Sequence, residues 1–136
     1  MVQRCANFER GAERATFKAL KDHPLGSNIK LLATGKAGGS VMKGMVTACS
    51  HLGVQYEGLI ATPYRLSVQI PNIRPIYGTH PVPDFRSIAA GEQIKQFVAN
   101  TQTDLICATT GGGSAGTVST CFLSSDELTQ VYKALL

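Results

Sequence analysis

The sequence lacks any apolar run that approaches the roughly 20 residues of a membrane-spanning helix, so we expect a soluble protein with no membrane association. Charged residues are also scarce, at 16% of the chain against 43% hydrophobic residues, which is typical of a globular domain. The low charge also suggests that part of its surface is buried against something outside this chain. Internal repeats, low-complexity segments and linkers are missing as well. At 136 residues, we therefore expect a single domain over residues 1–136, large enough to bury a core.

Closely spaced cysteines are missing too. No Cys-x-x-Cys pair is present, so the chain shows neither the usual spacing of a zinc site nor a disulfide framework. Most of the cysteines lie in apolar helix or strand patterns, where a cysteine is usually a small core residue. This usage fits a reduced, cytoplasmic setting, and Glu9 and Glu13 argue against a transit peptide at the N-terminus. The four cysteines are Cys5, Cys49, Cys107 and Cys121.

Acidic residues are sparse in the first third of the chain. Residues 1–43 hold eight of the 13 Lys and Arg residues but only three of the nine Asp and Glu residues, a balance of +5 in a chain of net charge +4. This basic half favours an anionic ligand. Nucleic acid is not expected as that ligand, because the basic residues are not clustered with aromatic ones and no nucleic-acid-binding motif is present.

The most informative stretch runs from Ile29 to Gly39. A short apolar run predicts a buried strand, which ends in a glycine-rich turn that carries Lys36. From Ser40 to Leu52, apolar residues recur at helical spacing. A strand, a glycine turn and a helix can form an anion site, since the first N–H groups of the helix have no intrahelical partner. The same pattern can also be only a tight strand-to-helix connection.

The rest of the chain alternates helices and strands, which predicts an α/β fold. We expect a three-layer, Rossmann-like domain with a mostly parallel sheet covered by helices on both faces. The loops that follow the strands would then meet at one edge of the sheet, where such folds bind ligands. In the first helix, Phe8, Ala12, Ala15 and Ala19 form the expected packing face. The predicted elements are helix 3–21, the strand from Ile29, helix 40–52, strand 57–62, a possible strand 73–77, helix 85–100, strand 104–109 and a final helix opened by a capping box at Ser124–Glu127.

Two common nucleotide-binding motifs do not fit. A Walker A loop needs glycine where this chain has Lys30 and a serine or threonine where it has Ala37. Gly111, Gly113 and Gly116 do match Gly-x-Gly-x-x-Gly, but no helix is expected directly after them, which disfavours a dinucleotide site.

A phosphate-binding interpretation remains. The segment Gly111–Ser114 offers consecutive backbone N–H groups and a hydroxyl, which is typical of an anion nest, and Lys36 can neutralise a phosphate. Asp84 could orient a hydroxyl or hold Mg²⁺, or could simply cap the following helix. His80 could contact the substrate, or bond a carbonyl within its own turn.

Four segments together resemble the amino-terminal domain of the glycerate 2-kinases, the class II glycerate kinases, some of which are labelled hydroxypyruvate reductase. The resemblance implies ATP-dependent phosphorylation of the 2-hydroxyl of D-glycerate with Mg²⁺, and it implies that Lys36 is catalytic. The segments are Asn28–Gly39, Gly58–Pro63, Gly78–Gly91 and Asp104–Ala115. The candidate substrate- and phosphate-binding residues are Gly35, Ala37, Gly38, His80, Asp84, Gly111, Gly112, Gly113 and Ser114.

The chain departs from the pattern of that family in ways that affect its expected activity. Thr110 and Gly116 stand where the family usually has serine and leucine. Family members are also much longer, and their second domain supplies an arginine and an acidic motif that close the site. We therefore expect a fragment or reduced relative that needs a completing domain, or that self-associates. The alternatives are a phosphosugar-binding module of the sugar isomerase type and a non-catalytic fragment.

Overall fold

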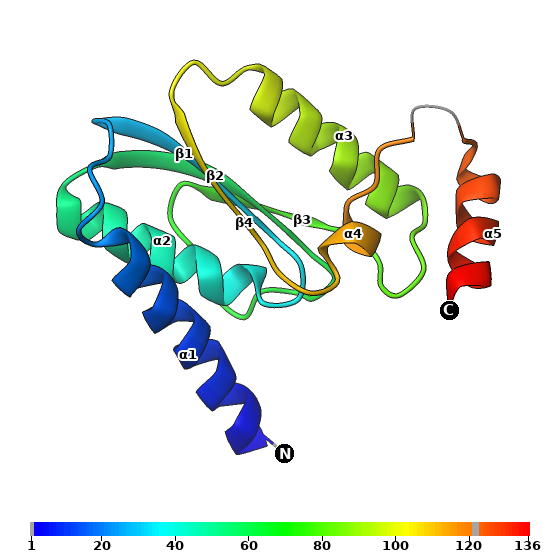
Figure 1. Cartoon of the computed structure of the whole chain (residues 1–136), viewed down its shortest axis with the longest axis horizontal. Coiled ribbons are helices and arrows are strands. Elements are labelled where there is room, and N and C mark those ends of the chain that lie inside the picture. The colour runs from blue at the N-terminus through cyan, green and yellow to red at the C-terminus, as the bar shows by residue number, and fades with distance from the viewer. Residues whose placement is uncertain (1, 121–122) are drawn as a thin grey trace.

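The computed structural model describes residues 2–120 and 123–136, with side chains from residue 8 onwards. All the predicted helices and strands are present, including the possible strand at residues 73–77 (Figure 1). A short helix, α4, was not predicted. In chain order the elements are α1 (Val2–Leu20), β1 (Asn28–Thr34), α2 (Gly38–Leu52), β2 (Gln55–Thr62), β3 (Ile73–Tyr77), α3 (Phe85–Ala99), β4 (Asp104–Thr109), α4 (Gly113–Gly116) and α5 (Ser125–Leu135).

The four strands form one parallel sheet in the order β3-β2-β1-β4, which confirms the predicted α/β class. Leu31 of β1 pairs with Gly58 on one side and Ile106 on the other. The two central strands, β1 and β2, each have five buried positions, and β1 is an almost continuous apolar run, which is typical of strands covered on both faces.

Helices cover both faces of the sheet (Figure 1). Alternate side chains of one strand point to opposite faces, so Leu31 packs toward α2 while Leu32 packs toward α3. The larger core cluster includes Met42, Met45 and Cys49 of α2. Cys107, by contrast, is exposed, because β4 lies at an edge of the sheet; this corrects its expected place in the core. Cys121 and the side chain of Cys5 lie outside the described residues.

Helix α1 packs on α2 and forms an outer layer (Figure 1). The two backbones approach closely at Gly44, where a Cβ atom would collide with the carbonyl oxygen of Glu13. The packing face of α1 contains Ala12, Phe17 and Leu20, whereas Phe8 is 68% exposed. The predicted face was therefore wrong except at Ala12.

Helix α5 begins with the predicted capping box, in which Ser124 and Glu127 bond each other's backbone N–H groups. Thr129 Oγ1 donates to the carbonyl of Pro83 at 3.4 Å, and Tyr132 Oη donates to the carbonyl of Ser114 at 3.1 Å. Leu128 is buried, but Leu135 is 78% exposed, so only part of the apolar face of α5 is covered. None of the helices described is both long and apolar enough to cross a membrane.

Candidate functional site

Three loops meet at the carboxyl edge of the sheet, as the sequence predicts. The loop after β1 is tied to the loop after β4 by two hydrogen bonds: Lys36 N donates to the carbonyl of Gly111 at 2.9 Å, and Ala37 N donates to Thr110 Oγ1 at 3.1 Å. Thr110 Oγ1 in turn donates to the carbonyl of Thr34 at 2.8 Å. Thr110, which sequence analysis noted only as a departure from a family pattern, is therefore the residue that joins the two glycine loops.

Two glycines make this junction possible. Gly35 has a φ of +95° and Gly112 a φ of +82°, a region that favours glycine. A Cβ atom on Gly112 would lie 2.9 Å from Cδ2 of His80 and 3.2 Å from Cγ and Cε of Lys36. The structure thus brings Lys36, His80 and Gly112 together from the loops after β1, β3 and β4.

Lys36 and His80 are both exposed at this junction, and their side chains make no hydrogen bond or ion pair with the rest of the described chain. The alternative interpretation of His80, a bond to a carbonyl of its own turn, therefore has no support in the geometry. The side chains of Lys36 and His80 are therefore available to bind a ligand beside Gly112.

The predicted nest is only partly available. Gly113 N donates to the carbonyl of Thr110 at 3.1 Å, so this amide is already engaged. The amides of Gly111 and Gly112 donate to no other residue of the described ranges. Gly111 is open to solvent, Gly112 caps the N-terminus of α4, and Ser114 is exposed. The donors left for an anion include the amides of Gly111, Gly112 and Ser114 and the hydroxyl of Ser114.

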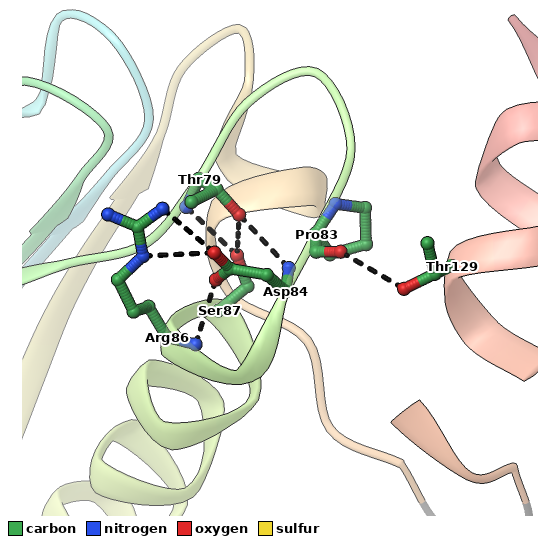
Figure 2. Close-up of polar contacts among 6 residues, drawn as sticks. All are labelled: Thr79, Pro83, Asp84, Arg86, Ser87 and Thr129. Carbon is green, nitrogen blue, oxygen red and sulfur yellow. Dashed lines mark hydrogen bonds and ion pairs between the residues drawn. The ribbon is translucent and has the colours of Figure 1, made fainter. Parts of the chain in front are cut away.

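Asp84 has a structural role, as one of the two interpretations of the sequence proposes. It caps α3: Oδ1 accepts from Arg86 N at 2.8 Å, and Oδ2 accepts from Nε and Nη2 of Arg86 at 3.0 and 2.8 Å (Figure 2). These hydrogen bonds lower the pKa of Asp84 below its ordinary value. Arg86 therefore occupies both carboxylate oxygens.

The loop before α3 is held by a second set of polar contacts that the sequence analysis missed. Thr79 N donates to Ser87 Oγ at 2.9 Å, and Asp84 N donates to Thr79 Oγ1 at 3.0 Å (Figure 2). Ser87 and Pro83 are fully buried, and the His80–Pro81 peptide is cis. The available signal was Ser87 three residues after Asp84, a spacing at which a polar side chain can reach back across the helix start.

Gly38 is buried at the start of α2, where a Cβ atom would lie 3.3 Å from Ile60, so it serves packing. No group of three or more His, Cys, Asp or Glu side chains that could hold a metal ion occurs among the described side chains of residues 8–120 and 123–136. With Asp84 engaged by Arg86, the donor set does not fit a magnesium site made by these residues alone.

Comparison with known proteins adds one match. A family model described as Domain of unknown function (DUF4147) matches residues 2–136, and this domain occurs as the N-terminal domain of glycerate kinase/MOFRL proteins. No curated protein and no solved structure matches the chain.

Proposed function

Because the chain belongs to the DUF4147 family, we propose that it forms the amino-terminal half of a glycerate 2-kinase site, in which a phosphoryl group passes from ATP to the 2-hydroxyl of D-glycerate. The observation that carries this proposal is the meeting of Lys36, His80 and Gly112 at the carboxyl edge of a parallel sheet. This edge is where α/β sheets bind their ligands.

Each of the three residues has a defined task in this proposal. The free ammonium group of Lys36 neutralises charge on the phosphoryl oxygens, which is the main requirement of phosphoryl transfer. Gly112 lets the ligand approach the backbone between Lys36 and His80. His80 bonds a polar group of the acceptor. ATP, when bound, supplies the phosphoryl group, and the residues of this chain orient it.

One lysine and a glycine loop cover only one side of a transferring phosphoryl group, so we propose that a further domain supplies the remaining charge. No step above is routed through Mg²⁺, since Arg86 engages both carboxylate oxygens of Asp84. The exposure of Lys36, His80 and Ser114 is consistent with a site that another surface closes.

Calorimetric titration of the purified chain tests the proposal. D-glycerate, ATP and glucose 6-phosphate are titrated in turn, each with and without Mg²⁺, into the wild-type chain, into Lys36→Ala and into the control Lys133→Ala on α5. We expect weak binding of ATP and glycerate that Lys36→Ala abolishes and Lys133→Ala retains, and a coupled assay should detect no turnover by the chain alone.

Two results would contradict the proposal. Tight binding of glucose 6-phosphate without binding of ATP would favour the phosphosugar-binding module. Binding of none of the three ligands would favour a non-catalytic fragment.

A further inference from the structure

A basic pocket lies beside Lys36, between the start of α2, the loop at residues 63–72 and one residue of α1. It encloses about 100 Å³. Among the side chains that the structure describes, three cations line it, Lys36, Lys43 and Arg65, together with several hydroxyl groups and the single acid Glu9. Lys43 and Arg65 play no part in the site described above, and the sequence analysis assigned them no role.

The charges of this pocket are not neutralised by the protein. No carboxylate of the described residues lies within ion-pair distance of Lys36, Lys43 or Arg65. Three cations against Glu9 leave an excess of two positive charges, which matches a phosphate dianion. Charge-assisted hydrogen bonds from lysine and arginine to phosphate are among the stronger polar contacts in proteins.

The size of the pocket limits which part of a ligand it can hold. The pocket has a volume of about 100 Å³ and opens to solvent, so a phosphate group fits inside it while the rest of a larger ligand can extend outside. Side chains that can donate to phosphate oxygens are present, since Ser40 and Ser67 line the pocket as well.

Helix α2 adds partial positive charge to a pocket that the three cations already define. Its first turn contains no acidic residue, and Ala37 at its N-cap provides no side-chain hydrogen bond. Gly39 and Ser40, from that first turn, line the pocket. The N-terminal end of the helix dipole therefore reinforces the side-chain charges.

We propose that this pocket binds a phosphate group, held mainly by Lys43 and Arg65, with Lys36 shared between the pocket and the cleft at Gly112. The proposal does not depend on glycerate as the acceptor. Free phosphate, a nucleotide and a phosphosugar carry the same group, so one experiment with separate ligands can distinguish these sources.

The test is an amide-resolved NMR titration of the ¹⁵N-labelled chain with inorganic phosphate, followed by AMP and glucose 6-phosphate. We expect the amide signals of Gly39, Ser40 and Ser67 to shift. Lys43→Gln and Arg65→Gln should each weaken phosphate binding by about tenfold, while the matched control Lys133→Gln should leave it unchanged.

Glu9→Gln should change the affinity for phosphate in the opposite direction. Removing the only acid of the pocket should tighten phosphate binding several-fold, an effect that loss of folding cannot mimic. Thermal unfolding of each variant serves as the check on folding. A ligand that binds more tightly than inorganic phosphate, and loses this advantage in Arg65→Gln, identifies the molecule that carries the phosphate group.

Two outcomes overturn the inference. If phosphate binding survives in Lys43→Gln and Arg65→Gln but is lost in Lys36→Ala, the anion lies in the cleft at Gly112, and the proposed function stands without the pocket. If no amide of the pocket shifts with phosphate, the pocket is not a phosphate site. Phosphate binding in the pocket without any glycerate binding would instead contradict the proposed function alone.

Discussion

Two loops at the same edge of the sheet differ in how many of their polar side chains form hydrogen bonds, although His80 of the loop before α3 is free like Lys36. In the loop before α3, the side chains of Thr79, Asp84 and Ser87 bond one another or the backbone (Figure 2). In the loop after β1, hydrogen bonds of the main chain and of Thr110 hold the backbone, and the side chain of Lys36 stays free. A polar side chain near a site is therefore a candidate for binding or catalysis only where it does not already form hydrogen bonds within the protein.

The largest expected effect is at the free lysine. In a protein that carries this domain with its completing half, Lys36→Ala should lower glycerate kinase turnover by about 10²-fold or more, because the positive charge that we propose Lys36 holds beside the phosphoryl group would be lost. The melting temperature should stay nearly the same, since Lys36 is exposed and makes no side-chain bond with the described residues. Steady-state kinetics and calorimetry check both parts, and lost stability with retained turnover would make Lys36 structural.

The next effect is at the glycine between the two loops. Gly112→Val adds a side chain that meets His80 and Lys36 at a φ of +82°, so it should abolish binding of ATP and glycerate in the cleft and cost about 1–2 kcal/mol of unfolding free energy. Gly111→Ala is the matched control, because a Cβ atom there has no neighbour within 4 Å. Titration and urea unfolding of both variants are the measurements. Equal binding by the two would show that the ligand does not approach Gly112.

A smaller effect is expected in the loop whose side chains are engaged. Ser87→Ala leaves the amide of Thr79 without its buried partner and should lower the unfolding free energy by about 1–3 kcal/mol. Anion binding should remain, apart from any unfolded fraction. Ser50→Ala, at an exposed position of α2, is the control. If Ser87→Ala weakened binding without affecting stability, the distinction between the two loops would fail.

The smallest effect concerns pH. The pKa of Asp84 lies below its ordinary value of 3.8, so its contribution to stability is present above that value and is lost as the pH falls through the lowered pKa. Asn still caps a helix but cannot titrate. Between about pH 5 and pH 3, wild type should therefore lose slightly more stability than Asp84→Asn. Parallel slopes in acid unfolding would show that the contact with Arg86 contributes nothing.

The fold could be predicted from the sequence because the order of the elements follows from local patterns. Even β3 forms despite Pro75, since it is an edge strand, where a missing N–H can face solvent. The packing face of α1 could not be predicted, because the close approach at Gly44 selects it, and that contact joins distant parts of the chain. Cys107 was misassigned for a related reason, since the pattern of a strand does not tell whether it lies at an edge.

The candidate site was predictable to a lesser degree. The glycine turns, Lys36 and His80 stand out by residue type, and the parallel sheet brings them together. The network of Thr79 and Ser87 was missed because ordinary hydroxyl residues give no distinct signal until their partners are known. Lys43 and Arg65 were missed because they come from a helix and a loop that meet only in the folded chain.

The packing of α1 on α2 affects which part of the molecule unfolds locally first. Because α1 packs chiefly against another helix and contributes no strand to the sheet, we expect it to open before the sheet does. Its amide protons should then exchange with solvent well before those of β1. Glu9 belongs to α1, so each such opening would remove its negative side chain from the basic pocket and leave Lys36, Lys43 and Arg65 open to solution.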